Sequence, residues 1–280
     1  MFQSTISILL STLVTFLVIL TISLRQNPIA VISGFTRDLF RDRLLMVHVI
    51  ACLGILALNK LELLIEPTLD KSWDWTPYIR TFEGNVTPLL QHWFNYEPLT
   101  YFTTYFYVIV FSVLMACSLL IYHREKDYRS LYVLLYSIGF NYIFAIPFYL
   151  FAPVSEAWYN HSDIKFLIPS VYPGFEAGYR SFSGLDNSFP SLHTSLSVTL
   201  ALIAWQSVNR RFGRITFFTA GVILFAIIYL GIHWYLDLIA GVVLALCSVA
   251  LAYRFSEVPL GKMSNLSSRQ QASDHVADAQ

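Results

Sequence analysis

Long apolar stretches alternate with short polar connections along almost the whole chain. Each stretch is roughly 20 residues long, the length that a helix needs to cross the hydrocarbon core of a bilayer. Seven such stretches are Ile6–Leu24, Leu44–Ile65, Leu99–Tyr122, Leu131–Phe151, Ser191–Val208, Ile215–Ile232 and Leu236–Tyr253. Because backbone polar groups cannot bond to water inside the bilayer, such segments are expected to be helical. The pattern therefore predicts an all-α, polytopic membrane helix bundle with about seven transmembrane helices.

The Lys and Arg residues are distributed unevenly between the two sets of connections, thirteen in one set and four in the other. The larger set is Arg25, Arg37, Arg41, Arg43, Arg124, Lys126, Arg129, Arg210, Arg211, Arg214, Arg254, Lys262 and Arg269. The smaller set is Lys71, Arg80, Lys165 and Arg180. Because basic residues accumulate on the cytoplasmic side of a membrane protein, we predict an N-terminus outside and a C-terminus in the cytoplasm.

Composition agrees with a membrane protein. The chain is 56% hydrophobic and only 13% charged, whereas soluble domains carry about a quarter charged residues. Positive and negative charges balance at 18 each, so nothing points to a nucleic-acid partner. Cys52, Cys117 and Cys247 all fall inside apolar stretches. This placement indicates packing residues rather than a disulfide framework.

We divide the chain into three parts. Residues 1–98 hold two transmembrane helices and a loop with an aromatic cluster (Trp73, Trp75, Tyr78 and Phe82), which is expected at the membrane interface. The first stretch has no basic residue before Arg25 and no cleavage site after it, so we predict an anchor rather than a signal peptide. Residues 99–255 form the membrane core, and the polar segment 256–280 is expected to be disordered.

His233 and Asp237 are four residues apart at the outside junction of the last two stretches. On a helix, residues at this spacing share a face. Asp237 can then accept a hydrogen bond from one ring nitrogen of His233, which fixes the tautomer and leaves the other nitrogen as a base or nucleophile. By itself, the pair is equally compatible with a structural contact that joins two helix ends.

A second polar segment reads Asp-Asn-Ser-Phe-Pro-Ser-Leu-His and ends at His193, at the outside end of the fifth stretch. Asn187 or Ser188 fits a helix N-cap, and Pro190 fits the first turn. The free amides of such a helix start can bind an anion, and Ser191 would add a hydroxyl donor. Alone, His193 is also compatible with an interfacial histidine that has no catalytic role.

The charge pattern places both histidine segments on the same side of the membrane. Two histidines, a partnered aspartate and an anion site at a helix end are together typical of phosphoryl transfer through a phosphohistidine. We therefore predict His193, His233 and Asp237 as catalytic residues.

The sequence Pro190-Ser191-Leu192-His193, followed by His233-x-x-x-Asp237, resembles the type 2 phosphatidic acid phosphatase superfamily. Phe-Pro-Ser-Leu-His, ending at His193, is similar to the branch that contains the fungal inositol phosphorylceramide synthases. The resemblance covers roughly Leu131–Tyr253. It implies a six-helix core and chemistry without a metal or cofactor. It also implies that His233 is the nucleophile, that His193 protonates the leaving oxygen, and that Asp237 orients His233.

The chain departs from the superfamily pattern in its cations. The usual Lys and Arg-Pro motif is absent, and Ile227 stands where an Arg usually precedes the nucleophilic histidine. Because a phosphate dianion needs cationic or several donor partners, other residues must meet its charge. We predict Arg180 as the phosphate-binding cation, with Lys165 second. Asn141 begins a polar-aromatic segment that resembles the synthase branch, and we expect it to line the same pocket.

Two functions share this chemistry as far as the phosphohistidine. One is a lipid phosphatase that hydrolyses a lipid phosphate or diphosphate, with water as the acceptor. The other is a lipid phosphotransferase, in which a second alcohol accepts the phospho-head group. We favour hydrolysis, on the extracytoplasmic face of the membrane, with a lipid phosphate and the bilayer as the partners.

Three other classes remain as alternatives. A transporter is expected to show inverted repeats, and the sequence shows no such symmetry. A zinc hydrolase could use His193, His233 and Asp237 as ligands. An intramembrane protease would use Ser191 or Ser195 as its nucleophile.

Overall fold

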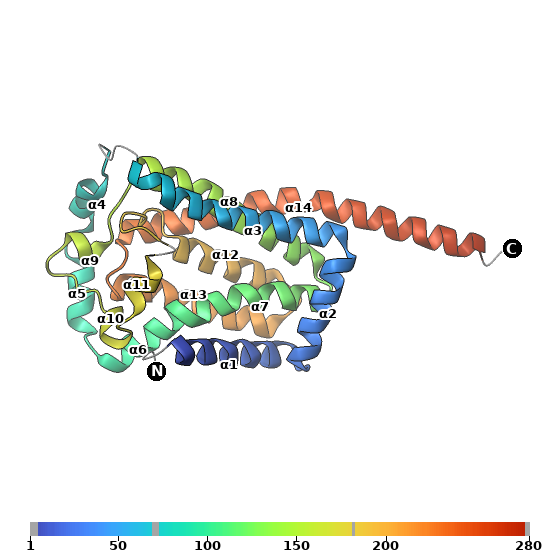
Figure 1. Ribbon diagram of the computed structural model, residues 1–280, viewed down its shortest axis with the longest axis horizontal. Helices are drawn as coiled ribbons and strands as arrows, with labels where there is room; N and C mark the ends of the chain where they lie inside the picture. The colour runs from blue at the N-terminus through green and yellow to red at the C-terminus, as the bar shows by residue number, and fades with distance from the viewer. Residues whose placement is uncertain (1–4, 69–72, 181–182, 278–280) are drawn as a thin grey trace.

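The computed structural model describes residues 5–68, 73–180 and 183–277, and over this part of the chain it is a bundle of long helices (Figure 1). The long helices are α1 (Thr5–Leu24), α3 (Arg43–Ile65), α7 (Phe111–Arg124), α8 (Tyr128–Phe151), α12 (Leu192–Gln206), α13 (Arg210–Tyr229) and α14 (Tyr235–Ala277). α6 (Glu97–Tyr105) and the π-helical η2 (Phe106–Val110) lead directly into α7, so these three form one span. The prediction of an all-α polytopic bundle is confirmed.

Among the described residues, six helices are long and apolar enough to cross a membrane. The predicted span Ser191–Val208 instead forms α12, which has 15 residues. At 1.5 Å per residue this helix is about 22 Å long, shorter than the roughly 30 Å hydrocarbon core. α12 packs against α7, α8, α13 and α14 at the centre of the bundle. Because protein surrounds it, α12 does not need the length of a lipid-facing helix.

The outer helices turn apolar side chains outward. Leu13 and Val14 on α1, and Ile50 and Leu53 on α3, are all exposed. A soluble protein rarely leaves contiguous apolar surface of this kind uncovered. These faces are therefore the surfaces that contact lipid, and the chain is an integral membrane protein.

Short helices collect at the two ends of the bundle. α2 (Pro28–Arg41) crosses one end, where α14 leaves the bundle (Figure 1). The other end carries α4 (Thr76–Glu83), α5 (Val86–Trp93), α9 (Ala157–Asn160), α10 (Ile168–Val171) and α11 (Phe175–Tyr179). A three-residue 3-10 helix, Glu66–Thr68, follows α3. Aromatic side chains of α4 and α5, such as Phe82 and Trp93, are exposed, while the expected place of this loop at the membrane interface stays a prediction.

Helix α14 continues past its membrane span to Ala277 and projects beyond the bundle (Figure 1). An isolated polar helix gains little from packing and is marginally stable in water. The expected disorder of 256–280, like the boundaries of the three parts of the chain, stays a prediction.

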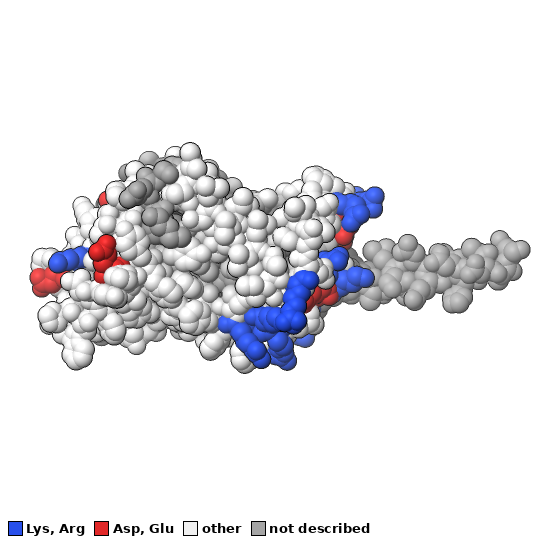
Figure 2. Space-filling view, turned by 90° about the horizontal axis from the view of Figure 1, so that it is seen from below, with Lys and Arg blue, Asp and Glu red and all other residues white. Residues whose placement is uncertain are grey.

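Basic side chains gather at the end of the bundle from which the tail of α14 projects (Figure 2). Ten exposed basic residues belong to the three connections at this end of the bundle: Arg25, Arg37, Arg41, Arg43, Arg124, Lys126, Arg129, Arg210, Arg211 and Arg214. Of the four cations assigned to the opposite side, Lys71 lies outside the described residues. The charge asymmetry follows the long axis of the bundle, while the side of the membrane on which each end lies stays a prediction.

We expect cysteines introduced at Ser162 and Gly178 to react with a membrane-impermeant thiol reagent in intact cells. Cysteines at Arg124 and Arg211 should react only after the membrane is permeabilised. All four positions are exposed, so access across the membrane decides the result. The opposite labelling pattern would place the two histidines on the cytoplasmic side.

Candidate active site

The spacing alone predicts that His233 and Asp237 share a helix. In the structure, His233 lies in the turn between α13 and α14, and Asp237 lies on α14. Gly231 has a φ of +81°, and an added Cβ would collide with the backbone oxygen of Lys165, so glycine is required in this turn. The predicted contact is still present, because Nδ1 of His233 lies 3.2 Å from Oδ2 of Asp237. The same carboxylate oxygen accepts the amide of Trp234 at 2.9 Å. Asp237 therefore holds the turn and the imidazole together.

Ser188 completes this contact and was not predicted as part of the site. Its Oγ lies 3.0 Å from Nδ1 of His233 and donates to Oδ2 of Asp237 at 2.5 Å. The amide of Ser188 bonds to the carbonyl of Val154, which fixes this extended segment against the preceding loop. Nδ1 of His233 is thus occupied by two partners, and Nε2 is the nitrogen left for chemistry.

The start of α12 differs from the expectation. Ser191, not Asn187 or Ser188, is the N-cap, and its side chain accepts the amide of Thr194 at 3.3 Å. Pro190 therefore precedes the cap instead of occupying the first turn. The amide of Ser191 also donates to the backbone oxygen of Asp237 at 3.2 Å. The buried Ser191 hydroxyl caps the helix, which differs from the predicted role of a donor to phosphate.

His193 lies in the first turn of α12 and is enclosed by aromatic rings. Its ring stacks on Tyr107 with centroids 4.1 Å apart and contacts Phe111 at 4.7 Å. Nδ1 of His193 lies 3.3 Å from the hydroxyl of Tyr107. Both aromatic partners come from the span that contains η2 and α7.

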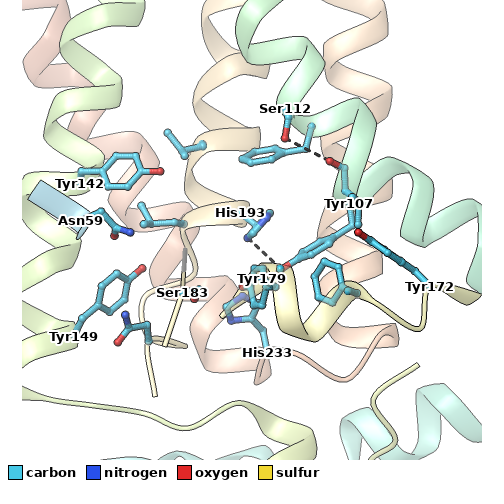
Figure 3. Close-up of a pocket in the computed structure, with 17 residues that line it drawn as sticks. Asn59, Tyr107, Ser112, Tyr142, Tyr149, Tyr172, Tyr179, Ser183, His193 and His233 are labelled. Atoms are coloured by element: carbon cyan, nitrogen blue, oxygen red, sulfur yellow. Dashed lines mark hydrogen bonds between the residues drawn. The ribbon is translucent and has the colours of Figure 1, made fainter. Parts of the chain in front are cut away.

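Both histidines line one cavity of about 420 Å³ (Figure 3). Its wall comes from α3, η2, α7, α8, α11, α12 and the two loops that carry Asn187 and His233. Five tyrosines line it, namely Tyr107, Tyr142, Tyr149, Tyr172 and Tyr179. The residues that line it in the described part of the chain include no Lys or Arg. Hydroxyl, amide and imidazole groups therefore supply the hydrogen bonds in this cavity.

Arg180 lies beside the cavity but is engaged elsewhere. Its guanidinium forms two hydrogen bonds with the carboxylate of Glu156, at 2.9 and 2.7 Å. Burial alone would lower the pKa of Arg180, but the hydrogen bonds and charge of Glu156 hold the pKa above its ordinary value. Arg180 also covers the ring of Tyr179, 5.3 Å from its centroid. In this arrangement Arg180 anchors the end of α11, which carries Tyr179, while its predicted role as the phosphate-binding cation stays a prediction.

The other two predicted binding residues are also outside the cavity wall. Lys165 is exposed, and its backbone exchanges hydrogen bonds with the side chain of Gln91. Asn141 is buried and donates to Ser137 and Thr199. Its neighbour Tyr142 lines the cavity instead, because successive residues of a helix point in different directions.

We expect Arg180→Ala to destabilise the protein, by about 3 kcal/mol, because removal of one partner leaves the Glu156 carboxylate buried without its cation. The side chain of Glu156 is only 3% exposed and that of Arg180 is 22% exposed. Thermal unfolding in detergent should show the loss, and Glu156→Gln should show a similar loss. The double variant should lose less than the sum of the two. Unchanged stability of Arg180→Ala together with a large loss of turnover would support the original assignment to phosphate.

Groups of three or more metal-ligating side chains do not occur among the described residues. His193, His233 and Asp237 do not form such a group, because Asp237 contacts the Nδ1 side of His233 while His193 contacts Tyr107.

A family model matches residues 80–251, which include both histidines, every helix from α5 to α13 and most of the membrane span of α14. That model describes the PAP2 superfamily. The chain is a member of the PAP2 superfamily. Comparisons with curated proteins and with solved structures give no match. The resemblance of the histidine motifs is thus confirmed for the PAP2 superfamily, while the branch similar to inositol phosphorylceramide synthases stays a prediction.

Proposed function

We propose that this protein is a membrane enzyme that hydrolyses a lipid phosphate or diphosphate through a phosphohistidine on His233. One observation carries the proposal: Nδ1 of His233 is held by Ser188 and Asp237, while the same side chain lines a cavity shared with His193. A histidine whose Nδ1 is fixed in this way presents Nε2 as a nucleophile.

The reaction follows from these positions in two steps. Nε2 of His233 attacks phosphorus, the bond from phosphorus to the lipid oxygen breaks, and His193 gives its proton to that oxygen. In the second step His193 removes a proton from water, the resulting hydroxide attacks phosphorus, and the bond to His233 breaks. Asp237 stabilises the positive charge that His233 carries in the intermediate.

The position of the cavity supports a lipid as the substrate. Its wall includes Val108, Ser112 and Leu196, which belong to helices of the membrane bundle. Ser112 is exposed on the outer surface of α7, on the side that would face lipid. A substrate whose tail stays in the bilayer could reach the histidines along this side without leaving the membrane.

The absence of Lys and Arg from the described cavity wall favours a second candidate, a phosphotransferase. A phosphodiester lipid carries one negative charge, whereas a phosphate monoester carries up to two at neutral pH. A cavity that offers tyrosine hydroxyls and Asn187 instead of cations can stabilise a substrate with one negative charge more easily than a substrate with two. The acceptor would then be a second alcohol rather than water.

One assay tests both candidates. Purified protein in detergent should be given lipid phosphate monoesters, lipid diphosphates and phosphodiester lipids, each with and without a lipid alcohol. Free phosphate from monoesters or diphosphates, formed without the alcohol, supports the phosphatase. A new phospholipid that forms only with the alcohol supports the phosphotransferase. Absence of turnover with every class would contradict both.

A further inference from the structure

Tyr107 connects His193 to a second tyrosine inside the cavity. Its hydroxyl lies 3.3 Å from Nδ1 of His193 and 3.3 Å from the hydroxyl of Tyr179 (Figure 3). The Tyr107 side chain is almost completely buried. A hydrogen-bonded chain therefore runs from α11 through η2 to α12, although these three segments are far apart in sequence.

The direction of the hydrogen bonds follows from the chemistry of a hydroxyl. Tyr107 has one hydroxyl proton, and it donates this proton to the oxygen of Tyr179. The Tyr107 oxygen is then an acceptor toward His193, so Nδ1 of His193 carries the proton of that contact. Nε2 is left as the nitrogen that can exchange a proton with a substrate.

The helix that carries Tyr107 has an unusual backbone at this point. Residues Phe106–Val110 form a π-helix within an otherwise α-helical span, and the amide of Phe111 bonds to the carbonyl of Phe106, five residues earlier. An extra residue in one turn rotates the preceding part of a helix by about 100° relative to the part after the turn. Tyr107 lies within this π-helical turn, Phe111 directly follows it, and both contact the His193 ring. Such π-helical turns are frequent at functional sites.

We propose that Tyr107 is a positioning residue that holds His193 in the tautomer and ring orientation required for proton transfer through Nε2. The proposal rests on the proposed function, in which His193 protonates the leaving lipid oxygen. In that step the proton on Nε2 of His193 moves to the lipid oxygen, while the bond from phosphorus to that oxygen breaks and the bond to Nε2 of His233 forms. Tyr107 keeps its own proton, and its oxygen continues to accept the hydrogen bond from Nδ1.

The test is Tyr107→Phe, which keeps the stacked ring and removes only the hydroxyl. We expect kcat for a lipid phosphate with an ordinary alcohol leaving group to fall about 10- to 100-fold, with little change in KM. The hydroxyl stabilises the protonated imidazole, so its loss should move the basic limb of the pH profile to lower pH by roughly 0.5 to 1 unit. A p-nitrophenyl phosphate ester needs no proton on its leaving group. With this substrate, the rate constant for formation of the phosphohistidine should stay near the wild-type value.

Two further variants make the result specific. Tyr136→Phe is a matched control, because the Tyr136 hydroxyl bonds to Nε2 of His48 at 2.9 Å, and neither residue lines the cavity. Tyr136→Phe should leave kcat for both substrates and the pH profile unchanged. Tyr179→Phe removes the group that accepts the Tyr107 proton. The loss of kcat in the double variant should therefore be smaller than the losses of Tyr107→Phe and Tyr179→Phe added as free energies.

An equal loss on both substrates in Tyr107→Phe would indicate a structural role and overturn the proposal, and so would unchanged kinetics. Failure of the proposed function has a different signature, namely turnover that persists after His233 is replaced. The two failures are therefore distinguishable in one set of measurements.

Discussion

Replacing His233 with alanine is expected to abolish turnover of every substrate, while chelators leave the wild-type activity unchanged. His233 forms the covalent bond to phosphorus in the proposed mechanism, and no other described histidine in the cavity has its Nδ1 held by a carboxylate. Loss of a covalent nucleophile commonly costs about a millionfold in kcat. The loss should therefore reach the detection limit of a phosphate-release assay.

The phosphoenzyme provides a direct measurement. Wild-type protein quenched during turnover of a ³²P-labelled substrate should carry label that is stable to base and labile to acid, as expected for a phosphohistidine, and His233→Ala should carry none. His48→Ala is a suitable control, since His48 lies on α3, outside the cavity wall, and contacts Tyr136. Near wild-type activity of His233→Ala would exclude the mechanism.

Asp237→Asn is expected to lower kcat by several orders of magnitude. The structure shows why one oxygen matters: Oδ2 of Asp237 meets Nδ1 of His233, the Ser188 hydroxyl and the Trp234 amide at once. An amide in this place carries no charge to stabilise the cationic intermediate, and its NH₂ group can present a donor to Nδ1. The equivalent change in a serine protease triad costs about ten-thousandfold.

Ser188→Ala provides the comparison for Asp237→Asn. It removes one partner of Nδ1 and leaves the carboxylate, so we expect a loss of about 10- to 100-fold, equivalent to one charge-assisted hydrogen bond. Steady-state kinetics in detergent, with thermal unfolding to check the fold, would measure both variants. A kcat of Asp237→Asn within tenfold of wild type would show that the carboxylate only holds the turn.

The bundle itself could be predicted from the sequence because its determinants are local. A helix that faces lipid must be apolar over its whole length, so the spans of α1, α3, α8 and α13 can be recognised in the sequence as uninterrupted apolar stretches. The stretch Ser191–Val208 was also predicted as a span, but it forms the shorter helix α12, because a helix enclosed by other helices can be shorter than the membrane is thick.

The His233–Asp237 contact could also be predicted, since the two residues are four apart and stay close in a turn as well as in a helix. Their relation to His193 followed from the side on which each connection was placed by its charges. These inferences used only residues close together in the sequence or the charge of whole connections.

Tertiary structure alone decided the remaining partners. Ser188 is 45 residues from His233, and Tyr107 is 86 residues from His193, so no periodicity links either pair. Arg180 carried the right charge for phosphate, but Glu156, which follows α8 and is 24 residues away, holds its guanidinium. A sequence records which groups can bond. Which of several possible partners each group meets depends on how the helices pack, because packing sets distances between residues that the chain itself leaves far apart.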